Sequence, residues 1–185
     1  KMINGEKWLN NKIQAKLTVI KMDNYNRAYE YQLKSKPSPN LPNLKSINLY
    51  PSLCFFEQTP VSVGRGTEMQ FQVIGSPNWI NQPFSFTPRP NFGAKNPKHN
   101  GIKCFGLDLR DENRLSEINL EWLIKAYNYS PEKDNFFRTG FYRLAGNKEL
   151  EDQIKAGMSS DDIKSTWKKD IESYKIVRNK YILYN

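Results

Sequence analysis

The spacing of the hydrophobic residues changes once along this chain, and that change constrains the fold more than any other feature. Up to about residue 110, short alternating stretches rich in β-formers predict strands, which we place at Lys16–Met22, Met69–Ile74, Pro83–Thr87 and Lys103–Leu109. From Asn119 onward the hydrophobic residues follow a helical period. We therefore expect an α/β fold of the α+β type: a mixed β-sheet of about four to six strands in the first two thirds, helices packed beside it, and a C-terminal helical segment.

Local signals place the helices, because cap residues, prolines and glycines mark helix ends. The last helix is expected to begin at Ser159, whose side chain forms a capping pair with Asp162. The other helices are expected at residues 2–10, at Ser46–Glu57 with Pro51 in the first turn or at a kink, from Asn119 to Ser130, and at Lys148–Ala156. The last helix also carries an apolar stripe that we expect to lie in the core, made of Ile163, Trp167, Ile171, Tyr174, Val177 and Tyr181.

The charge of the chain limits its partners. The net charge is +9, and the excess of basic residues lies within residues 1–100. A basic surface attracts polyanions, but these lysines and arginines are scattered and no nucleic-acid-binding signature accompanies them. We therefore expect no nucleic acid partner, and the 185 residues are enough for one compact domain.

Cysteine and histidine usage argues against metal chemistry. Cys54 and Cys104 stand fifty residues apart in apolar surroundings, and His99 is the single histidine. No metal-ligand spacing results, so we expect neither a metal nor a cofactor. Buried free thiols are favoured over a disulfide, which an exported protein would permit. No apolar run is long enough for a membrane span, and the first residues lack the hydrophobic stretch of a signal peptide.

The segment from Glu57 to Thr67 is the strongest candidate for a site. Gly64 and Gly66 flank Arg65, so the backbone is free to take a positive φ or to approach a ligand closely. The Arg65 guanidinium supplies a planar fork of donors suited to a carboxylate. The alternative is structural, namely a bulge or strand end whose arginine lies on the surface. The amide-rich and basic loop at residues 88–101 adds weaker candidates, which together with Thr67 are Asn96, Lys98 and His99.

Several longer motifs occur together in this chain, in one order. Together they closely resemble the carboxy-terminal half of the NamZ-type exo-β-N-acetylmuramidases, a bacterial family long known only as a domain of unknown function. The motifs are Ser38-Pro-Asn-Leu-Pro-Asn43, Leu49-Tyr-Pro-Ser-Leu-Cys-Phe-Phe-Glu57, Val61-Ser-Val-Gly-Arg-Gly-Thr67, Phe84-Ser-Phe-Thr-Pro88, Gly93-Ala-Lys-Asn-Pro-Lys98, Gly106-Leu-Asp-Leu-Arg110, Ile118-Asn-Leu-Glu-Trp-Leu-Ile124 and the closing Lys175-Ile-Val-Arg-Asn-Lys-Tyr-Ile-Leu-Tyr184.

The resemblance implies a glycoside hydrolase that releases N-acetylmuramic acid from the non-reducing ends of peptidoglycan fragments, without a cofactor. It implies that residues 1–185 are a single carboxy-terminal domain of a longer enzyme, and that the active site lies in a cleft shared with an amino-terminal Rossmann-like domain. That partner domain, where the proposed catalytic glutamates are thought to reside, is absent from this sequence. The resemblance further implies muramic acid glycosides from peptidoglycan as substrates and an exported protein, periplasmic or at the cell surface. One departure from the family pattern is Gln58, where glycine is expected.

The implied substrate agrees with the residues at one point. Muramic acid carries a lactyl carboxylate, and we hypothesise that Arg65 binds it or orients Glu57. Glycosidases ordinarily use two carboxyl groups, whereas here Glu57 is the best single candidate in the motif region. Asp108 lies on an apolar strand, where the alternative is a satisfied acid of the core or of a strand end. We therefore expect the chain to form part of a substrate site and to be inactive on its own.

Two other interpretations remain open. A non-catalytic module could bind an anionic polymer or glycan through the basic first half, since composition alone permits it. A structural domain with an incidental glycine turn is the third interpretation, and it predicts no cleft near Arg65.

Overall fold

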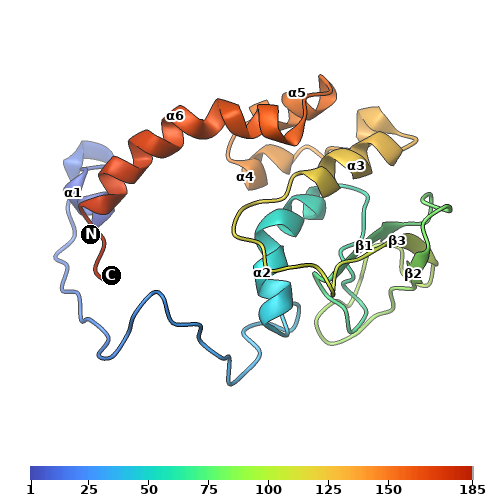
Figure 1. The fold of residues 1–185 in the computed structure, drawn as a ribbon, viewed down its shortest axis with the longest axis horizontal. Coiled ribbons are helices and arrows are strands. Elements are labelled where there is room, and N and C mark those ends of the chain that lie inside the picture. The colour runs from blue at the N-terminus through green and yellow to red at the C-terminus, as the bar shows by residue number, and fades with distance from the viewer. Residues whose placement is uncertain (185) are drawn as a thin grey trace. The chain divides into compact units, whose positions relative to one another are not determined.

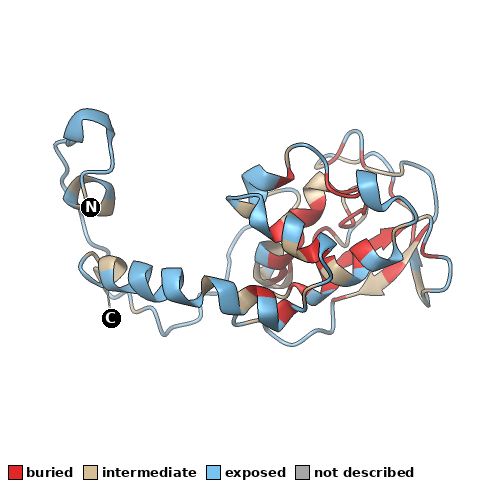
Figure 2. Ribbon diagram, turned by 90° about the horizontal axis from the view of Figure 1, so that it is seen from above, coloured by how far each residue is buried: buried red, intermediate tan, exposed pale blue. Residues whose placement is uncertain are grey.

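The computed structural model describes residues 1–184, which divide into two compact units. The larger unit holds residues 33–163, and the smaller one combines residues 1–32 with the chain from Lys164 onward (Figure 1). Buried residues gather in the larger unit, whereas the residues of the smaller unit are mostly exposed (Figure 2). The hydrophobic core therefore belongs to the larger unit.

A small antiparallel sheet lies in the larger unit. Its strands, in the spatial order β1-β3-β2, are β1 (Val73–Ser76), β2 (Phe84–Phe86) and β3 (Cys104–Asp108). The register pairs Gly75 with Gly106 on one side of β3 and Phe86 with Cys104 on the other. Val73, Phe86 and Cys104 form a buried cluster of this sheet.

The α+β class is confirmed, but the sheet is smaller than expected and antiparallel rather than mixed. The strands expected at 83–87 and 103–109 form. The strand expected at Met69–Ile74 begins only at Val73, as β1. The reason is that Met69 to Gln72 form a turn, in which the Gln72 amide donates to the Met69 carbonyl at 3.0 Å. The strand expected at Lys16–Met22 is wrong for this structure, since no other segment of residues 1–184 pairs with it. A fourth strand and any parallel pair are therefore missing from the described chain.

The helix before the candidate site follows from a strong cap. The Asn43 side chain accepts a hydrogen bond from the Ser46 amide at 2.9 Å, and the Ser46 hydroxyl accepts one from the Asn43 amide at 3.3 Å. This reciprocal cap starts α2 (Leu44–Leu53), which continues directly as the 3₁₀ helix η2 (Cys54–Gln58). Pro51 lies in the last turn of α2, not in its first turn as one alternative had it. The expected position of Glu57 at the end of this helical segment is confirmed.

Helices of the last third complete the larger unit. An aromatic cluster joins them: the ring centroids of Phe137 lie 4.5 Å from those of Phe141 and 5.5 Å from those of Tyr127, and Phe141 also packs on Phe55 of η2 at 6.1 Å. The elements are α3 (Glu121–Tyr129), η3 (Lys133–Asn135), α4 (Phe141–Ala145), α5 (Glu149–Lys155) and the start of α6 (Ser160–Asn179). The expected helices at 119–130 and 148–156 are thus confirmed.

The long helix α6 begins as expected, because the Asp162 amide donates to the Ser159 hydroxyl at 3.1 Å. Its apolar stripe, however, is mostly not core. Ile163 is buried in the larger unit, but Ile171 and Tyr174 are 44% and 50% exposed. The reason is that the smaller unit offers this helix little to pack against within residues 1–184, namely α1 (Met2–Gly5), the 3₁₀ helix η1 (Asn10–Lys12) and extended chain.

The smaller unit is held by a few polar contacts. The Tyr181 hydroxyl donates to the Glu6 carboxylate at 2.6 Å, and the Met22 amide donates to the Tyr184 hydroxyl at 2.8 Å. Helix α1 is shorter than the 2–10 helix expected, and Lys7 after it has a φ of +55°.

The two cysteines are free thiols in the structure. Cys104 is buried on β3, and burial raises its pKa to about 12. Cys54 is partly buried at the start of η2. Among residues 1–184, no helix is both long and apolar enough to span a membrane.

Candidate ligand-binding site

A cavity of about 310 Å³ lies in the larger unit, beside the glycine-flanked arginine. Two segments line it, one from the end of η2 to Arg65 and the other from the loop at residues 93–98. The lining residues are Glu57, Gln58, Ser62, Val63, Arg65, Gly93, Ala94, Lys95, Asn96, Pro97 and Lys98. Four of the predicted site residues are thereby brought together, namely Glu57, Arg65, Asn96 and Lys98. The lining does not include Gly64, Gly66, Thr67 or His99.

The two glycines beside Arg65 are required by the fold of the turn. Gly64 has a φ of +76° and Gly66 a φ of +84°. A Cβ on Gly64 would lie 2.6 Å from the Met69 carbonyl oxygen, and a Cβ on Gly66 would lie 2.7 Å from both the Arg89 carbonyl oxygen and Pro97 Cβ. Both the backbone conformation and the close approach of neighbouring chain therefore select glycine.

Thr67 closes the same turn. Its amide donates to the Gly64 carbonyl at 3.1 Å and its hydroxyl to the same oxygen at 2.7 Å. The preceding Ser62 pairs with Gly75 of β1 as an isolated bridge. The structural interpretation, a strand end followed by a tight turn, thus describes the backbone, while Arg65 in its middle lines a cavity.

Arg65 and Glu57 are partly buried side chains of the cavity wall. Within residues 1–184 neither side chain forms an ion pair or a hydrogen bond, with each other or with another group. The donors of the guanidinium and the oxygens of the carboxylate are therefore both available to a ligand.

Lys98 was predicted to contact a sugar, but in the structure its ammonium binds backbone carbonyls. Its Nζ donates to the carbonyl oxygens of Phe56 and Thr59 at 2.7 Å, of Glu57 at 3.1 Å and of Val61 at 3.2 Å. An ammonium has three hydrogens, so four carbonyls leave no donor for a ligand. Burial lowers the pKa of Lys98 to about 7. The positive charge of Arg138 acts in the same direction, whereas the negative charge of the Glu57 carboxylate raises this pKa.

His99 also turns toward the chain rather than the cavity. Its Nε2 lies 2.6 Å from the Pro60 carbonyl oxygen, to which it donates, and its φ is +56°. Its predicted contact with a sugar stays a prediction.

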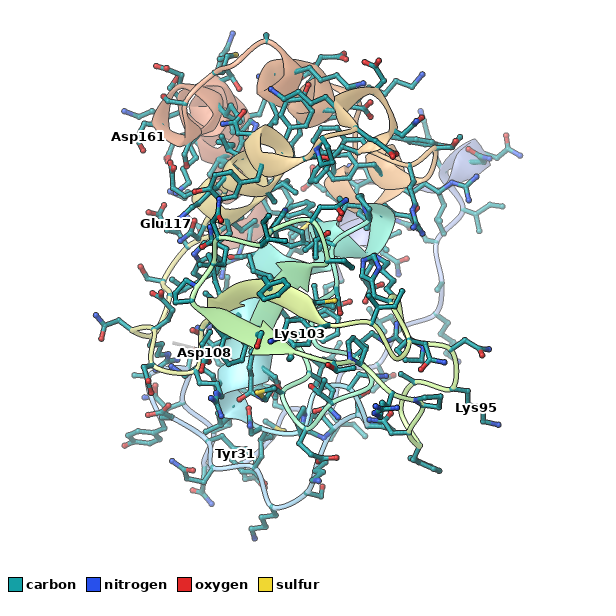
Figure 3. The ribbon with its side chains drawn as sticks, turned by 90° about the vertical axis from the view of Figure 1, so that its right-hand side faces the viewer. Tyr31, Lys95, Lys103, Asp108, Glu117 and Asp161 are labelled. Carbon is teal, nitrogen blue, oxygen red and sulfur yellow. The ribbon has the colours of Figure 1, made fainter. Side chains whose placement is uncertain are left out.

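Asp108, the other acid considered from the sequence, lies away from the cavity. It ends β3 and pairs with Arg110, whose Nη2 lies 2.6 Å from Oδ2. The hydrogen bond from Arg110 lowers the pKa of Asp108. Figure 3 shows Asp108 on the opposite side of the larger unit from Lys95 of the cavity loop. Among residues 1–184, the cavity lining therefore contains one carboxylate, that of Glu57.

Sequence reasoning missed two parts of the site. Gln58 and Lys95 line the cavity, although only the departure of Gln58 from the family pattern drew attention to it. The engagement of Lys98 with four carbonyls was also missed, because it depends on a contact between segments about forty positions apart. Glu57 and Arg65 were found because the glycine pattern marked their segment.

The chain belongs to the family described as "Exo-beta-N-acetylmuramidase NamZ, C-terminal", whose profile matches residues 48–184. The resemblance inferred from the motifs is thereby confirmed. Among individual relatives, the chain is 30% identical to the peptidoglycan beta-N-acetylmuramidase NamZ of Bacillus subtilis (strain 168), over 93% of this chain and 46% of that protein.

Two solved structures share the fold. A DUF1343 family protein from Bacteroides fragilis NCTC 9343 is 46% identical, with a TM-score of 0.92 over 100% of this chain and 53% of that one. A second DUF1343 protein from the same organism is 21% identical, with a TM-score of 0.72 over 100% of this chain and 54% of that one. The chain thus spans about half the length of these relatives.

Proposed function

We propose that this chain is the substrate-site-forming carboxy-terminal part of a peptidoglycan-degrading glycoside hydrolase that releases N-acetylmuramic acid from non-reducing ends. The family and the name of the Bacillus subtilis relative support the reaction class. The single observation that carries the proposal is the partly buried Arg65, which lines a cavity and has no partner within residues 1–184. An unpaired guanidinium at a cavity wall favours an anionic ligand, and the lactyl carboxylate of muramic acid is such a group.

The size of the cavity supports a small ligand. A volume of about 310 Å³ is at the lower end of the range of small-molecule sites, which run from about 300 to 1,000 Å³. One terminal sugar unit suits this space better than a long polymer segment. Arg65 would bind its carboxylate, while Glu57, Gln58 and Asn96 would contact the remaining polar groups of the sugar.

Hydrolysis requires more than these residues supply. One carboxyl group must donate a proton and a second must act as base or nucleophile, at a separation of about 5 to 9.5 Å. Since Glu57 is the carboxylate of the described lining, we propose that the second comes from an amino-terminal Rossmann-like domain of a longer polypeptide. The 185-residue chain alone would then be inactive.

One feature of the smaller unit, its segment at residues 16–22, favours the presence of such a partner domain. The alternating segment at residues 16–22 has the pattern of a strand, yet it forms no strand pair within residues 1–184, and its Ile20 is 91% exposed. A sheet edge in the partner domain would satisfy its backbone and cover its side chains. We further propose that the enzyme acts outside the cytoplasm, in the periplasm or at the cell surface, where intact peptidoglycan lies.

Calorimetric titration of the 185-residue chain tests the binding part of the proposal. N-acetylmuramic acid and N-acetylglucosamine form a matched ligand pair, because only the first carries the lactyl carboxylate. Charge-assisted hydrogen bonds contribute about 1.5–3 kcal/mol, so the acidic sugar should bind about 10- to 150-fold more tightly. Arg65→Met should abolish that preference, and Arg65→Lys should retain only part of it, since an ammonium cannot form the bidentate pair.

The control is Lys103→Met, which removes an exposed charge next to β3 and should leave the preference intact. Equal affinity for the two sugars in the wild type would refute the proposed role of Arg65. Tight binding of polyanions that weakens steeply with salt would instead favour an anionic-polymer module, because counterion release governs such binding.

A further inference from the structure

Every backbone carbonyl from residue 56 to residue 61 accepts a hydrogen bond from outside that segment. Lys98 Nζ binds those of residues 56, 57, 59 and 61, and His99 Nε2 binds that of Pro60. The remaining carbonyl, that of Gln58, accepts from the Arg138 amide at 2.9 Å. The segment that carries Glu57 and Gln58 is therefore held along its whole length by groups from two other parts of the fold.

The geometry joins the two walls of the cavity. Glu57 and Gln58 belong to one wall, whereas Lys98 closes the loop at residues 93–98 that forms the other. The Lys98 ammonium donates to carbonyl oxygens of the first wall. The loop at residues 93–98 therefore cannot move away from Glu57 without breaking several charge-assisted hydrogen bonds. Among residues 1–184, Lys98 forms no ion pair with a carboxylate, so these carbonyls are its main partners.

The converging carbonyls need a donor at this point. Four oxygens lie within 3.2 Å of one nitrogen, and they repel one another when no hydrogen-bond donor stands between them. An apolar side chain of similar length fills the space but leaves these oxygens unsatisfied. The turn would then open toward water.

We propose that Lys98 is a positioning residue, which with the help of His99 fixes the turn carrying Glu57 and Gln58 against the loop at 93–98 and so holds the cavity in its ligand-binding shape. Lys98 acts through the backbone and does not touch the ligand. The inference extends the proposed function, because the ligand used to measure the shape of the cavity is N-acetylmuramic acid.

Hydrogen exchange and ligand binding on the 185-residue chain test this role. At pH 6, Lys98→Met should lower the protection of the Thr59 and Arg138 amides by about tenfold or more, since both amides donate to carbonyls of the clamped segment. The affinity for N-acetylmuramic acid should fall by a similar factor. Protection of the β3 amides should be unchanged, and the matched surface variant Lys103→Met should change neither quantity.

A pH series separates positioning from a general loss of packing. Opening the turn exposes Lys98 to water, where its pKa returns toward 10.5 from about 7, so opening takes up a proton. Protection of Thr59 in the wild type should therefore rise about tenfold between pH 6.5 and 8.5 relative to Lys98→Met. The other charged or titratable groups near Lys98 are Glu57, Arg65, Arg138 and His99, and all are present in both proteins.

His99→Asn is the milder variant should Lys98→Met fail to fold. Asparagine tolerates the positive φ of this position and loses the bond to Pro60, so a loss of protection of about threefold is expected. The inference is overturned if the folded Lys98→Met protein, or otherwise His99→Asn, keeps wild-type protection and affinity within a factor of 1.5, or if wild type and Lys98→Met respond to pH in parallel. If the wild type binds no N-acetylmuramic acid, the proposed function fails, and the exchange data alone decide the role of Lys98.

Discussion

Substituting Gly66 by alanine should destabilise the larger unit more than the same substitution at Gly101, another glycine with a positive φ. A non-glycine residue with a left-handed backbone costs about 1–2 kcal/mol. At φ +84° the new Cβ would also lie 2.7 Å from the Arg89 carbonyl oxygen and 2.7 Å from Pro97 Cβ. Overpacking of this kind costs about 1–3 kcal/mol, which gives a total of about 2–5 kcal/mol for Gly66→Ala.

Gly101→Ala supplies the matched control. Gly101 has a φ of +75°, and a Cβ there would have no atom within 4 Å, so this variant pays the backbone cost alone. Urea denaturation followed by near-ultraviolet circular dichroism measures both changes, because that signal reports the packed aromatic cluster of the larger unit. Gly66→Ala should lose about 1–3 kcal/mol more than Gly101→Ala. Equal losses in the two variants would refute the close approach of the arginine turn to the chain at Arg89 and Pro97.

Two further predictions concern stability. Ser159→Ala removes the oxygen that accepts from the Asp162 amide, so it should reduce helix content at α6 and cost about 1 kcal/mol, measured by far-ultraviolet circular dichroism during urea denaturation; an unchanged transition would contradict the cap. Asp108→Asn should cost less than about 1 kcal/mol at pH 7, because its ion pair with Arg110 is partly exposed. Since the folded pKa of Asp108 is lowered below 3.8, its contribution is present above about pH 4 and lost as the pH falls through the lowered value, so wild type and Asp108→Asn should converge in stability near pH 2.

Much of the helical part of this fold can be predicted from the sequence because its signals are local. Ser159 and Asp162 are three positions apart, and their contact forms as the spacing indicates. A strand depends instead on a partner from elsewhere. The alternation at residues 16–22 has the right pattern, but no pairing segment is present in the described chain.

The candidate site divides in the same way. The glycine pattern located Arg65, since glycine is the residue type that most readily adopts the positive φ found at Gly64 and Gly66. The role of Lys98 could not be predicted, because a lysine in a basic loop has the same local pattern whether it faces a ligand or a ring of carbonyls. The two roles are distinguished only by the tertiary contact of residues 56–61 with residues 98 and 99, which the sequence does not reveal.

The segment at residues 16–22 has a practical consequence for work with the isolated chain. Its backbone forms no strand pair within residues 1–184, and beside exposed Leu17, Ile20 and Met22 it offers an edge onto which a second molecule can add its own strand. Stocks of this polypeptide should therefore become turbid as concentration rises. Ile20→Lys, which adds a charge to that edge, should keep them clear.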